Sequence, residues 1–460
     1  MTPILKFISL SVALLLVVAS CDDFVKTDPP RTSLIKSTVF ESDATANAAM
    51  LDIYYQLRTG TFAGGTSTSI SFLMSLSSDE QINYYLRGTP AINAEYQQIF
   101  DNALLSNNSI IFALWSDLYK VIYKSNAVLE GVGTSTQISN PVKKQLTGEA
   151  KFIRSFCFFY LVNLWGDIPL ATSTNYRLNS EIHRSPVADV YAQIISDLTD
   201  AQNLLPGDYS AWGGERVRAN KSVAAALLAR VYLYKKDWSN AEAQATSVIS
   251  LTSQYGLSAT LAGVFLKNNR EAILQSWSDM RVNERATFRV LSNPPLFAAL
   301  RPQYVTTFEA GDQRRTNWIE LTTGYYGPLK YTSTVDSPPT EYSTLLRVAE
   351  QYLIRAEARA QQENIAGAKS DINAIRTRAG LGNTTANDKA ALLLAVEQER
   401  KAELFTEWGH RWFDLKRTNR ADAVLGPLKT LWSGTDVLLP LPEAEIRNNA
   451  GLKDAQNPGY

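Results

Sequence analysis

The sequence predicts a mostly α-helical fold in which tetratricopeptide-type helical hairpins carry a loop-rich mixed insertion. Two observations support this fold class: long segments with the 3.6-residue apolar period of a helix, and two segments with the spacing of a tetratricopeptide repeat. The 460 residues are 45% hydrophobic and 20% charged, an ordinary globular composition that can bury a large core. We therefore expect residues 43–460 to form a single folded unit.

The N-terminus has the pattern of a bacterial lipoprotein signal. Lys6 supplies a positive charge, residues 10–18 are apolar, and two small residues precede Cys21. The apolar run is shorter than the ~20 residues that a membrane-spanning helix needs. We therefore predict a signal peptide over 1–20, lipidation at Cys21 and a tether over 21–42, so that lipid chains hold a soluble body at a membrane surface.

Helical and irregular segments alternate along the rest of the chain. The apolar period predicts a first helix near 43–57 and helical repeats over 108–251 and 346–417. The intervening segments, 60–100 and 253–345, lose this period and are richer in turn-forming and aromatic residues. We expect both to be loop-rich and to face a ligand.

Particular residues set the expected helix ends. Within the first repeat region we expect helices over 108–131 and 141–165. Ser185 before Pro186 predicts the start of another helix, because Ser is a good N-cap and Pro suits the first helical position.

Two further stretches carry expectations of their own. The Gly/Ser/Thr-rich stretch 60–78 has no helical period and predicts a long surface segment. The stretch 389–417 predicts one further helix, which we expect to be continuous.

Paired alanines mark the two repeat candidates. Ala229 and Ala241 are twelve residues apart, on either side of a predicted turn, and Ala356 and Ala368 repeat this spacing. A small residue is needed where the two helices of a hairpin approach closely. Both segments are therefore predicted to be helix-turn-helix units.

Charge and motif content exclude several function classes. Basic and acidic residues are equal in number, so no excess positive charge is present to attract nucleic acid. The two histidines, His183 and His410, have no Cys or Glu at ligand spacing, and no nucleotide-binding glycine pattern occurs. Cys157 lies in an apolar run and is interpreted as core packing. We therefore expect no metal, no cofactor and no nucleic-acid partner.

Three carboxylates form the nearest approach to a catalytic pattern. Glu399, Glu403 and Glu407 recur every four residues and would share a helix face. A pair such as Glu403 and Glu407 is what a surface glycosidase would use. The same segment carries the basic residues Arg400, Lys401 and Arg411. Basic neighbours keep carboxylates ionised, whereas a general acid needs a raised pKa, so the pattern favours structural ion pairing over catalysis.

Several stretches taken together resemble the SusD/RagB family. They are residues 148–156, 164–170, 218–234, 347–358, 399–417, 439–442 and 456–460. The resemblance spans the whole chain and includes the family's long helix, its repeats and its C-terminal signature. It implies a tetratricopeptide-containing, nutrient-binding lipoprotein of the Gram-negative outer membrane that is not an enzyme.

The resemblance also implies partners and a location. A family member of this kind binds an oligosaccharide at the cell surface and delivers it to a SusC-like TonB-dependent transporter. Asp22 and Asp23 resemble an acidic signal for export of lipoproteins to the exterior face of the outer membrane. A peptide or other nutrient is the alternative ligand on the same scaffold, and a scaffold lipoprotein without any ligand is a further alternative.

Loop aromatics beside polar residues are the candidate ligand contacts. Sugar rings present apolar C–H faces that stack on Trp and Tyr, while Asp, Asn or Arg can bond the hydroxyls. The first cluster is Asp79, Asn83, Tyr84, Tyr85 and Arg87, and the second is Trp277, Asp279, Arg281, Trp318, Tyr325 and Tyr326. The other interpretation of each aromatic is packing against the helices or the transporter.

Overall fold

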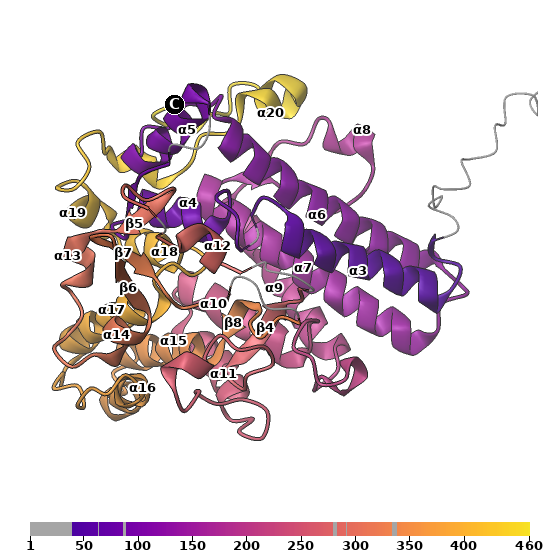
Figure 1. Cartoon of the computed structure of the whole chain (residues 1–460). Coiled ribbons are helices and arrows are strands. Elements are labelled where there is room, and N and C mark those ends of the chain that lie inside the picture. The colour runs from indigo at the N-terminus through magenta and orange to yellow at the C-terminus, as the bar shows by residue number, and fades with distance from the viewer. Residues whose placement is uncertain (1–38, 63, 86–88, 279–282, 291, 334–337) are drawn as a thin grey trace, which may run out of the picture.

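Helices make up most of the regular structure of the computed structural model and surround one large hydrophobic core (Figure 1). The structure describes residues 39–62, 64–85, 89–278, 283–290, 292–333 and 338–460. The mostly helical fold class is therefore confirmed. The predicted signal peptide, the lipidation site Cys21 and the tether up to residue 38 lie outside the described residues. Within the described ranges, no helix has both the length and the apolarity to cross a membrane.

Four helices form the N-terminal half of the core, and they pack side by side in Figure 1. They are α3 (Asp43–Thr59), α6 (Ser109–Thr134), α7 (Asn140–Trp165) and α9 (Val187–Leu204). α7 lies between α6 and α9, and most of its residues from Leu146 onward are buried, including Cys157. The core interpretation of Cys157 is thus confirmed. Phe40, in the segment expected to be tether, also packs on this core.

The start of α9 differs from the prediction by one residue. The helix begins at Val187, Pro186 is the N-cap, and Ser185 belongs to the short strand β3 (Arg184–Ser185). The Asp167 carboxylate accepts a hydrogen bond from the Val187 amide at 2.9 Å. Asp167, 20 residues earlier in the sequence, therefore caps the start of α9 in place of Ser185.

Two helical hairpins occupy the predicted repeat positions. The first consists of α10 (Lys221–Tyr234) and α11 (Trp238–Ile249), and the second of α15 (Val348–Gln361) and α16 (Ile365–Arg378). All four paired alanines are fully buried, and each pair shares a hydrophobic cluster. Small side chains thus lie where the helices approach, as the spacing predicted. The assignment of these hairpins to the tetratricopeptide class stays a prediction.

The stretch 389–417 is not one helix, and this prediction is wrong. α17 (Lys389–Leu404) and α18 (His410–Arg417) are separated by a break in which Thr406, Trp408 and Gly409 have positive φ. Glu80 accepts the Thr406 amide at 3.0 Å, and the Ser71 hydroxyl accepts the Trp408 amide at 2.9 Å. Acceptors from the N-terminal region therefore satisfy the amides that the interrupted helix leaves unpaired.

The stretch 60–78 is also not a surface segment throughout. It contains α4 (Ile70–Ser77), all of whose residues are buried. Its serines fit the core because their hydroxyls donate to backbone carbonyls of the preceding turn, as Ser75 does to Phe72 at 2.7 Å and Ser77 to Leu73 at 3.1 Å. A Ser-rich composition can therefore be buried without unpaired hydroxyls.

Antiparallel strands connect the two segments expected to be loop-rich. The four-stranded sheet has the order β1 (Gln81–Asn83), β5 (Ala298–Leu300), β7 (Tyr325–Pro328) and β6 (Ile319–Thr322). Two-stranded sheets join β4 (Ala272–Ser276) to β8 (Ser343–Arg347), and β2 (Ile168–Pro169) to β3. In the register of the first sheet, Asn83 is opposite Ala298 and Thr322 is opposite Tyr325. The sheet thereby brings Tyr325 of the second predicted cluster next to Tyr84 of the first.

The remaining α-helices are short. They are α5 (Pro90–Asp101), α8 (Tyr176–Asn179), α12 (Arg285–Phe288), α13 (Pro302–Val305), α14 (Gln313–Asn317), α19 (Ala421–Leu425) and α20 (Glu443–Asn448). The C-terminal segment closes over the end of α7, where the Trp165 indole donates to the Pro440 carbonyl at 2.9 Å and Asn457 donates to the Trp165 carbonyl. These contacts give the 456–460 motif a structural role.

Candidate functional site

A surface of tyrosines forms beside strand β5, which lies between β1 and β7 in the sheet. Tyr84 follows β1, and its ring meets the ring of Tyr325 edge-on, with centroids 5.3 Å apart and planes at 78°. Both side chains are partly exposed. Partial burial, together with Tyr325, raises the pKa of the Tyr84 hydroxyl above its usual value, so this group stays neutral at physiological pH. We call Asn83, Tyr84, Tyr85 and Tyr325 the tyrosine surface.

Neighbouring residues fix the tyrosine surface to the core. Tyr85 stacks on Tyr96 of α5, with centroids 3.9 Å apart, and also contacts Phe297. The Asn83 side chain accepts the Tyr85 amide at 3.0 Å and donates to the exposed Gln97 at 3.0 Å. Rigid aromatic rings therefore lie beside amide groups that can exchange hydrogen bonds with a ligand.

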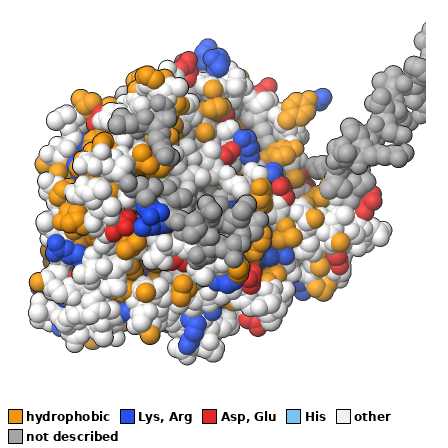
Figure 2. Space-filling model, viewed as in Figure 1, with side chains coloured by type: hydrophobic (Ala, Val, Ile, Leu, Met, Phe, Trp, Pro, Cys, Tyr) orange, Lys and Arg blue, Asp and Glu red, His pale blue; other side chains and the backbone are white. Residues whose placement is uncertain are grey.

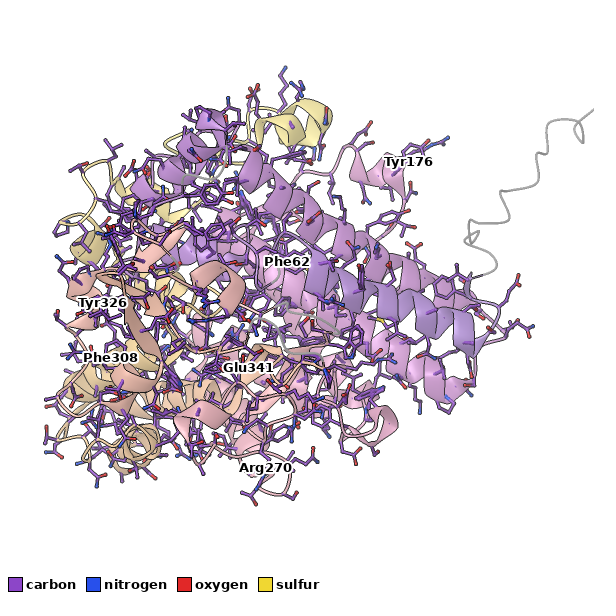
Figure 3. The ribbon with its side chains drawn as sticks, viewed as in Figure 1. Phe62, Tyr176, Arg270, Phe308, Tyr326 and Glu341 are labelled. Atoms are coloured by element: carbon purple, nitrogen blue, oxygen red, sulfur yellow. The ribbon has the colours of Figure 1, made fainter. Side chains whose placement is uncertain are left out.

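Tyr326 follows Tyr325 directly in the sequence but lies apart from the tyrosine surface. Successive side chains of a strand point to opposite faces, so Tyr326 lies on the other side of β7 from Tyr325. Tyr326 packs against a second core cluster that contains Phe308, and Figure 3 shows both on the same side of the molecule. It also lines a hollow of about 500 Å³ between α14 and β6. Tyr326 therefore does not belong to the tyrosine surface.

Two of the predicted contacts are buried, which corrects their interpretation as exposed ligand groups. The Asp79 carboxylate accepts hydrogen bonds from Arg411 at 2.7 and 2.9 Å; burial raises its pKa, but Arg411 and Lys401 outweigh burial and lower it. Trp318 is only 1% exposed and donates from its indole to the Leu261 carbonyl at 3.1 Å. Asp79 and Trp318 therefore stabilise the interior of the protein. Arg87, Asp279 and Arg281 lie outside the described residues.

Trp277 belongs to a different surface, a groove between α3 and β4. Trp277 is 46% exposed and Tyr55 on α3 is 53% exposed. The guanidinium carbon of Arg58 lies 5.5 Å from the Trp277 ring centroid and 5.8 Å from that of Tyr55. The groove has a volume of about 590 Å³, and buried aliphatic residues such as Leu274 and Leu345 line it. We call this hollow the α3–β4 groove.

Sequence reasoning missed Tyr55 and Arg58 as candidate contacts. Both lie inside a helix whose apolar period was explained by its buried residues Met50, Ile53 and Leu57. Leu51, Tyr55 and Arg58 form a second stripe on α3 at the spacing i, i+4, i+7. That stripe could have identified Tyr55 and Arg58 from the sequence. Only one face of α3 packs in the core, so packing does not explain exposed apolar residues on a second face.

A further hollow lies apart from the tyrosine surface and the α3–β4 groove. It measures about 620 Å³ and lies between α10, α15, α17 and α18. Its charged side chains pair with one another, as Arg417 does with Glu357 and Asp414, and Arg400 with Asp414. The Tyr234 hydroxyl, Nη1 and Nη2 of Arg400, and Nε of Arg420 nevertheless have no hydrogen-bond partner among the described residues, so the hollow keeps polar groups that a bound molecule could engage.

Comparison with known proteins decides the family. A family model described as "Starch-binding associating with outer membrane" matches residues 54–233, and the SusD family model matches residues 301–460. The chain belongs to the SusD/RagB family. A SusD-like protein of Formosa agariphila is 26% identical to it, over 96% of this chain and 97% of that protein.

Solved structures of SusD-like proteins have the same fold. A laminarin-binding SusD-like protein superposes with a TM-score of 0.75 at 24% identity, over 91% of this chain and 100% of that one. Surface glycan-binding protein A of Bacteroides thetaiotaomicron superposes with a TM-score of 0.77 at 18% identity, over 92% of this chain and 100% of that one. At these identities the likeness establishes the SusD fold.

The part of this SusD/RagB chain that carries the three glutamates forms a buried ion cluster. The cluster comprises Glu271, Arg314, Lys330, Arg347, Arg378, Glu399, Glu403 and Glu407. Glu403 accepts from Arg347 at 2.6 Å, from Arg314 at 3.3 Å and from Arg378. Burial raises the pKa of Glu403, but the three guanidinium groups outweigh it and hold the pKa far below its usual range.

The ion cluster supports the prediction of ion pairing over catalysis. The three glutamates, however, pair with other cations than their neighbours in the sequence. Arg400 pairs with Asp414, while Lys401 and Arg411 pair with Asp79, so none of the three pairs with Glu399, Glu403 or Glu407. The actual partners come from distant elements. Glu403 is fully buried and Glu407 nearly so, which leaves neither positioned to touch a substrate.

Glu284, next to the ion cluster, makes stability depend on pH. Burial raises its pKa to about 7, and its Oε2 atom has no hydrogen-bond partner among the described residues. Its Oε1 atom accepts from the Ser343 hydroxyl at 2.7 Å. The folded protein therefore favours the neutral acid at this position. As pH rises from 4.5 to 7, the unfolded chain releases this proton first and stability falls.

We expect Glu284→Gln to remove this contribution, because the amide keeps the acceptor without ionising. The free energy of unfolding of the variant relative to the wild type should rise by roughly 1–3 kcal/mol between pH 4.5 and pH 8. Urea denaturation at both pH values measures it, with exposed Glu41→Gln as the control. A difference that does not change with pH would contradict the neutral state of Glu284.

Proposed function

We propose that this protein captures oligosaccharides at the cell surface and delivers them to a SusC-like TonB-dependent transporter. The Tyr84–Tyr325 pair is the observation that carries the ligand assignment, because two partly exposed rings lie beside the Asn83 amide. Membership of the SusD/RagB family supports it, as do the glycan-binding and laminarin-binding names of proteins with this fold. We propose the tyrosine surface as the glycan site.

The chemistry of the tyrosine surface matches that of a sugar. The C–H face of a pyranose stacks on an aromatic ring, and its hydroxyls exchange hydrogen bonds with amide and phenol groups. Arg301 adds a cation nearby: its guanidinium lies over the Phe100 ring at 5.1 Å and acts electrostatically on Tyr84. Each stacking or hydrogen-bonding contact contributes only about 0.5–1.5 kcal/mol, so binding depends on several contacts at once.

The anchoring and delivery parts of the proposal rest on other observations. The lipoprotein signal that ends at Cys21 supports a lipid anchor in the outer membrane, and the acidic pair after it supports exposure to the exterior. The description of the family model supports association with the outer membrane. Apolar side chains and charges of both signs are interspersed on the face shown in Figure 2, which fits a neutral rather than a polyanionic ligand.

We expect Tyr84→Ala and Tyr325→Ala each to weaken glycan binding about tenfold, because each removes one stacking ring. Affinity electrophoresis of the chain from residue 22 against a panel of polysaccharides, laminarin and starch included, measures this loss. Tyr123→Ala is the matched control, since Tyr123 on α6 is 54% exposed and lies outside the tyrosine surface.

Two results would count against the proposal. Retardation that is equal for the wild type and both tyrosine variants would place the glycan elsewhere. A lack of retardation by every polysaccharide, combined with a change in intrinsic tryptophan fluorescence on adding a peptide mixture, would favour the peptide-binding alternative.

A further inference from the structure

The hollow between α10, α15, α17 and α18 has unused hydrogen-bond donors at its closed end. We call it the α17 hollow, because one face of α17 forms one of its walls, from Ala390 to Arg400. We propose that the α17 hollow binds a small organic carboxylate with an apolar group, and that Nη1 and Nη2 of Arg400 hold the carboxylate. The inference concerns a site apart from the tyrosine surface and does not depend on the proposed function.

Arg400 supplies two donors that no described residue accepts. The residue is only 2% exposed, and its Nε donates to the Asp414 carboxylate at 2.7 Å. Its Nη1 and Nη2 atoms are buried and have no partner among the described residues. Buried donors without an acceptor cost free energy, so this edge of the guanidinium favours an acceptor. Because Nε is already occupied, the edge between Nη1 and Nη2 is the one that can donate to both oxygens of a bound carboxylate.

The Tyr234 hydroxyl is a third donor of the α17 hollow. It is buried, and no residue in the described part of the chain bonds to it. Burial and Asp414 raise the pKa of this hydroxyl well above its usual value, although Arg417 and Arg400 act in the opposite direction. The phenol is therefore neutral and able to donate. The guanidinium carbon of Arg417 lies 5.6 Å from the Tyr234 ring centroid and helps to hold the ring in place.

The charges that line the α17 hollow suit a ligand with a single negative charge. Four cationic side chains line it against three anionic ones: Lys236, Arg400, Arg417 and Arg420 against Glu357, Glu397 and Asp414. One positive charge is therefore in excess. A carboxylate balances it, whereas a phosphate group carries more negative charge and would leave an excess of the other sign.

The α17 hollow becomes more apolar toward its opening. Along its α17 wall, Arg400 is buried, Leu393 is partly exposed and Leu394 is 59% exposed. Trp238, the first residue of α11 (Trp238–Ile249), also lines the hollow and is partly exposed. A ligand with its carboxylate at Arg400 would therefore place an apolar group against the two leucines and the indole, where the group loses contact with water.

Ligand-observed NMR titration of the chain from residue 22 at neutral pH tests the proposal. The probes are N-acetyl-L-leucine, hexanoate, inorganic phosphate and the uncharged N-acetyl-L-leucinamide. We expect at least one of the two acids to bind at least about tenfold more tightly than the amide and the phosphate. Tighter binding of N-acetyl-L-leucine would identify the carboxyl terminus of a peptide as the natural source, and equal or tighter binding of hexanoate would identify a free aliphatic acid.

Two substitutions assign the binding to the α17 hollow. Tyr234→Phe should weaken binding of the acid roughly three- to tenfold and leave thermal melting unlowered, because the lost hydroxyl has no partner in the folded protein. Tyr232→Phe is the matched control, since Tyr232 lies on the same helix but does not line the hollow. Arg400→Lys keeps the charge but replaces the two-pronged guanidinium by one ammonium, and should weaken binding at least about tenfold.

Four results would overturn the inference. They are the absence of binding by both acids, equal binding of N-acetyl-L-leucine and its amide, tighter binding of phosphate, and unchanged affinity in Tyr234→Phe. The last result decides even if Arg400→Lys does not fold. Tyr234→Phe should not change retardation by polysaccharides, so a failure of this inference is distinguishable from a failure of the proposed function.

Discussion

Glu403→Gln is expected to destabilise the protein by about 3–5 kcal/mol, although it changes a single atom of the side chain. Glu403 is fully buried and balances the charges of Arg314, Arg347 and Arg378. A neutral amide leaves these guanidinium groups with too little negative charge in a site that excludes water, and its NH₂ group would point at their donors. Urea denaturation at neutral pH, monitored by tryptophan fluorescence, measures the loss.

Glu397→Gln provides the matched control for this change. Glu397 lies on the same helix, α17, but is partly exposed and meets Arg411 and Arg420 at 3.4 Å each. A partly solvated pair of this kind contributes about 0–1 kcal/mol. If the two variants lost the same stability, the idea that Glu403 holds the cationic side chains of the ion cluster together would be wrong.

Trp318→Ala is expected to cost about 3–5 kcal/mol of stability without changing glycan affinity in the molecules that remain folded. The indole is buried between Phe265 and the cations of Lys330 and Arg378, and it donates a hydrogen bond to Leu261. Its removal leaves a large cavity and takes one hydrogen bond from the Leu261 carbonyl, which still accepts from the Val264 amide at 3.4 Å. Thermal and chemical denaturation measure the stability, and titration with a binding glycan measures the affinity.

Trp277→Ala is the same substitution at an exposed position and should cost no more than about 1 kcal/mol, because little apolar surface is uncovered. The two tryptophan variants should therefore differ in stability, with Trp318→Ala losing far more than Trp277→Ala. A stable Trp318→Ala protein with reduced affinity would restore Trp318 as a ligand contact.

The helical part of the fold could be predicted because its signals are local. The apolar period placed the helices around Ile111 and Val190, and alanine spacing placed the two hairpins. The predictions that are wrong depend on distant contacts. The break before Gly409 exists because Glu80 and Ser71 accept its free amides, and the Ser-rich helix α4 is buried because the core surrounds it.

The sequence predicted which types of residue would form the candidate site, but not which individual residues would lie at the surface. Trp277 and Trp318 lie in similar turn-rich sequence, yet one is half exposed and the other is buried. Tyr325 and Tyr326 are adjacent, yet the strand places them on opposite faces. Tyr55 was missed because it lies in a helix whose core-facing residues already explained the apolar period. No local pattern distinguishes Trp277 from Trp318, whereas the exposed stripe on α3 was a local signal for Tyr55.

The sequence by itself determined the helical fold class, the positions of the repeats, the resemblance to the family and the preference for ion pairing over catalysis at Glu399, Glu403 and Glu407. Only the tertiary structure decided which cations these carboxylates meet, which aromatic rings reach the surface, and that Tyr84 lies against Tyr325 while Trp277 lies beside Arg58. The reason is physical: periodicity and capping act between residues a few positions apart, whereas burial and charge pairing arise from chain segments that meet only when the whole core has formed.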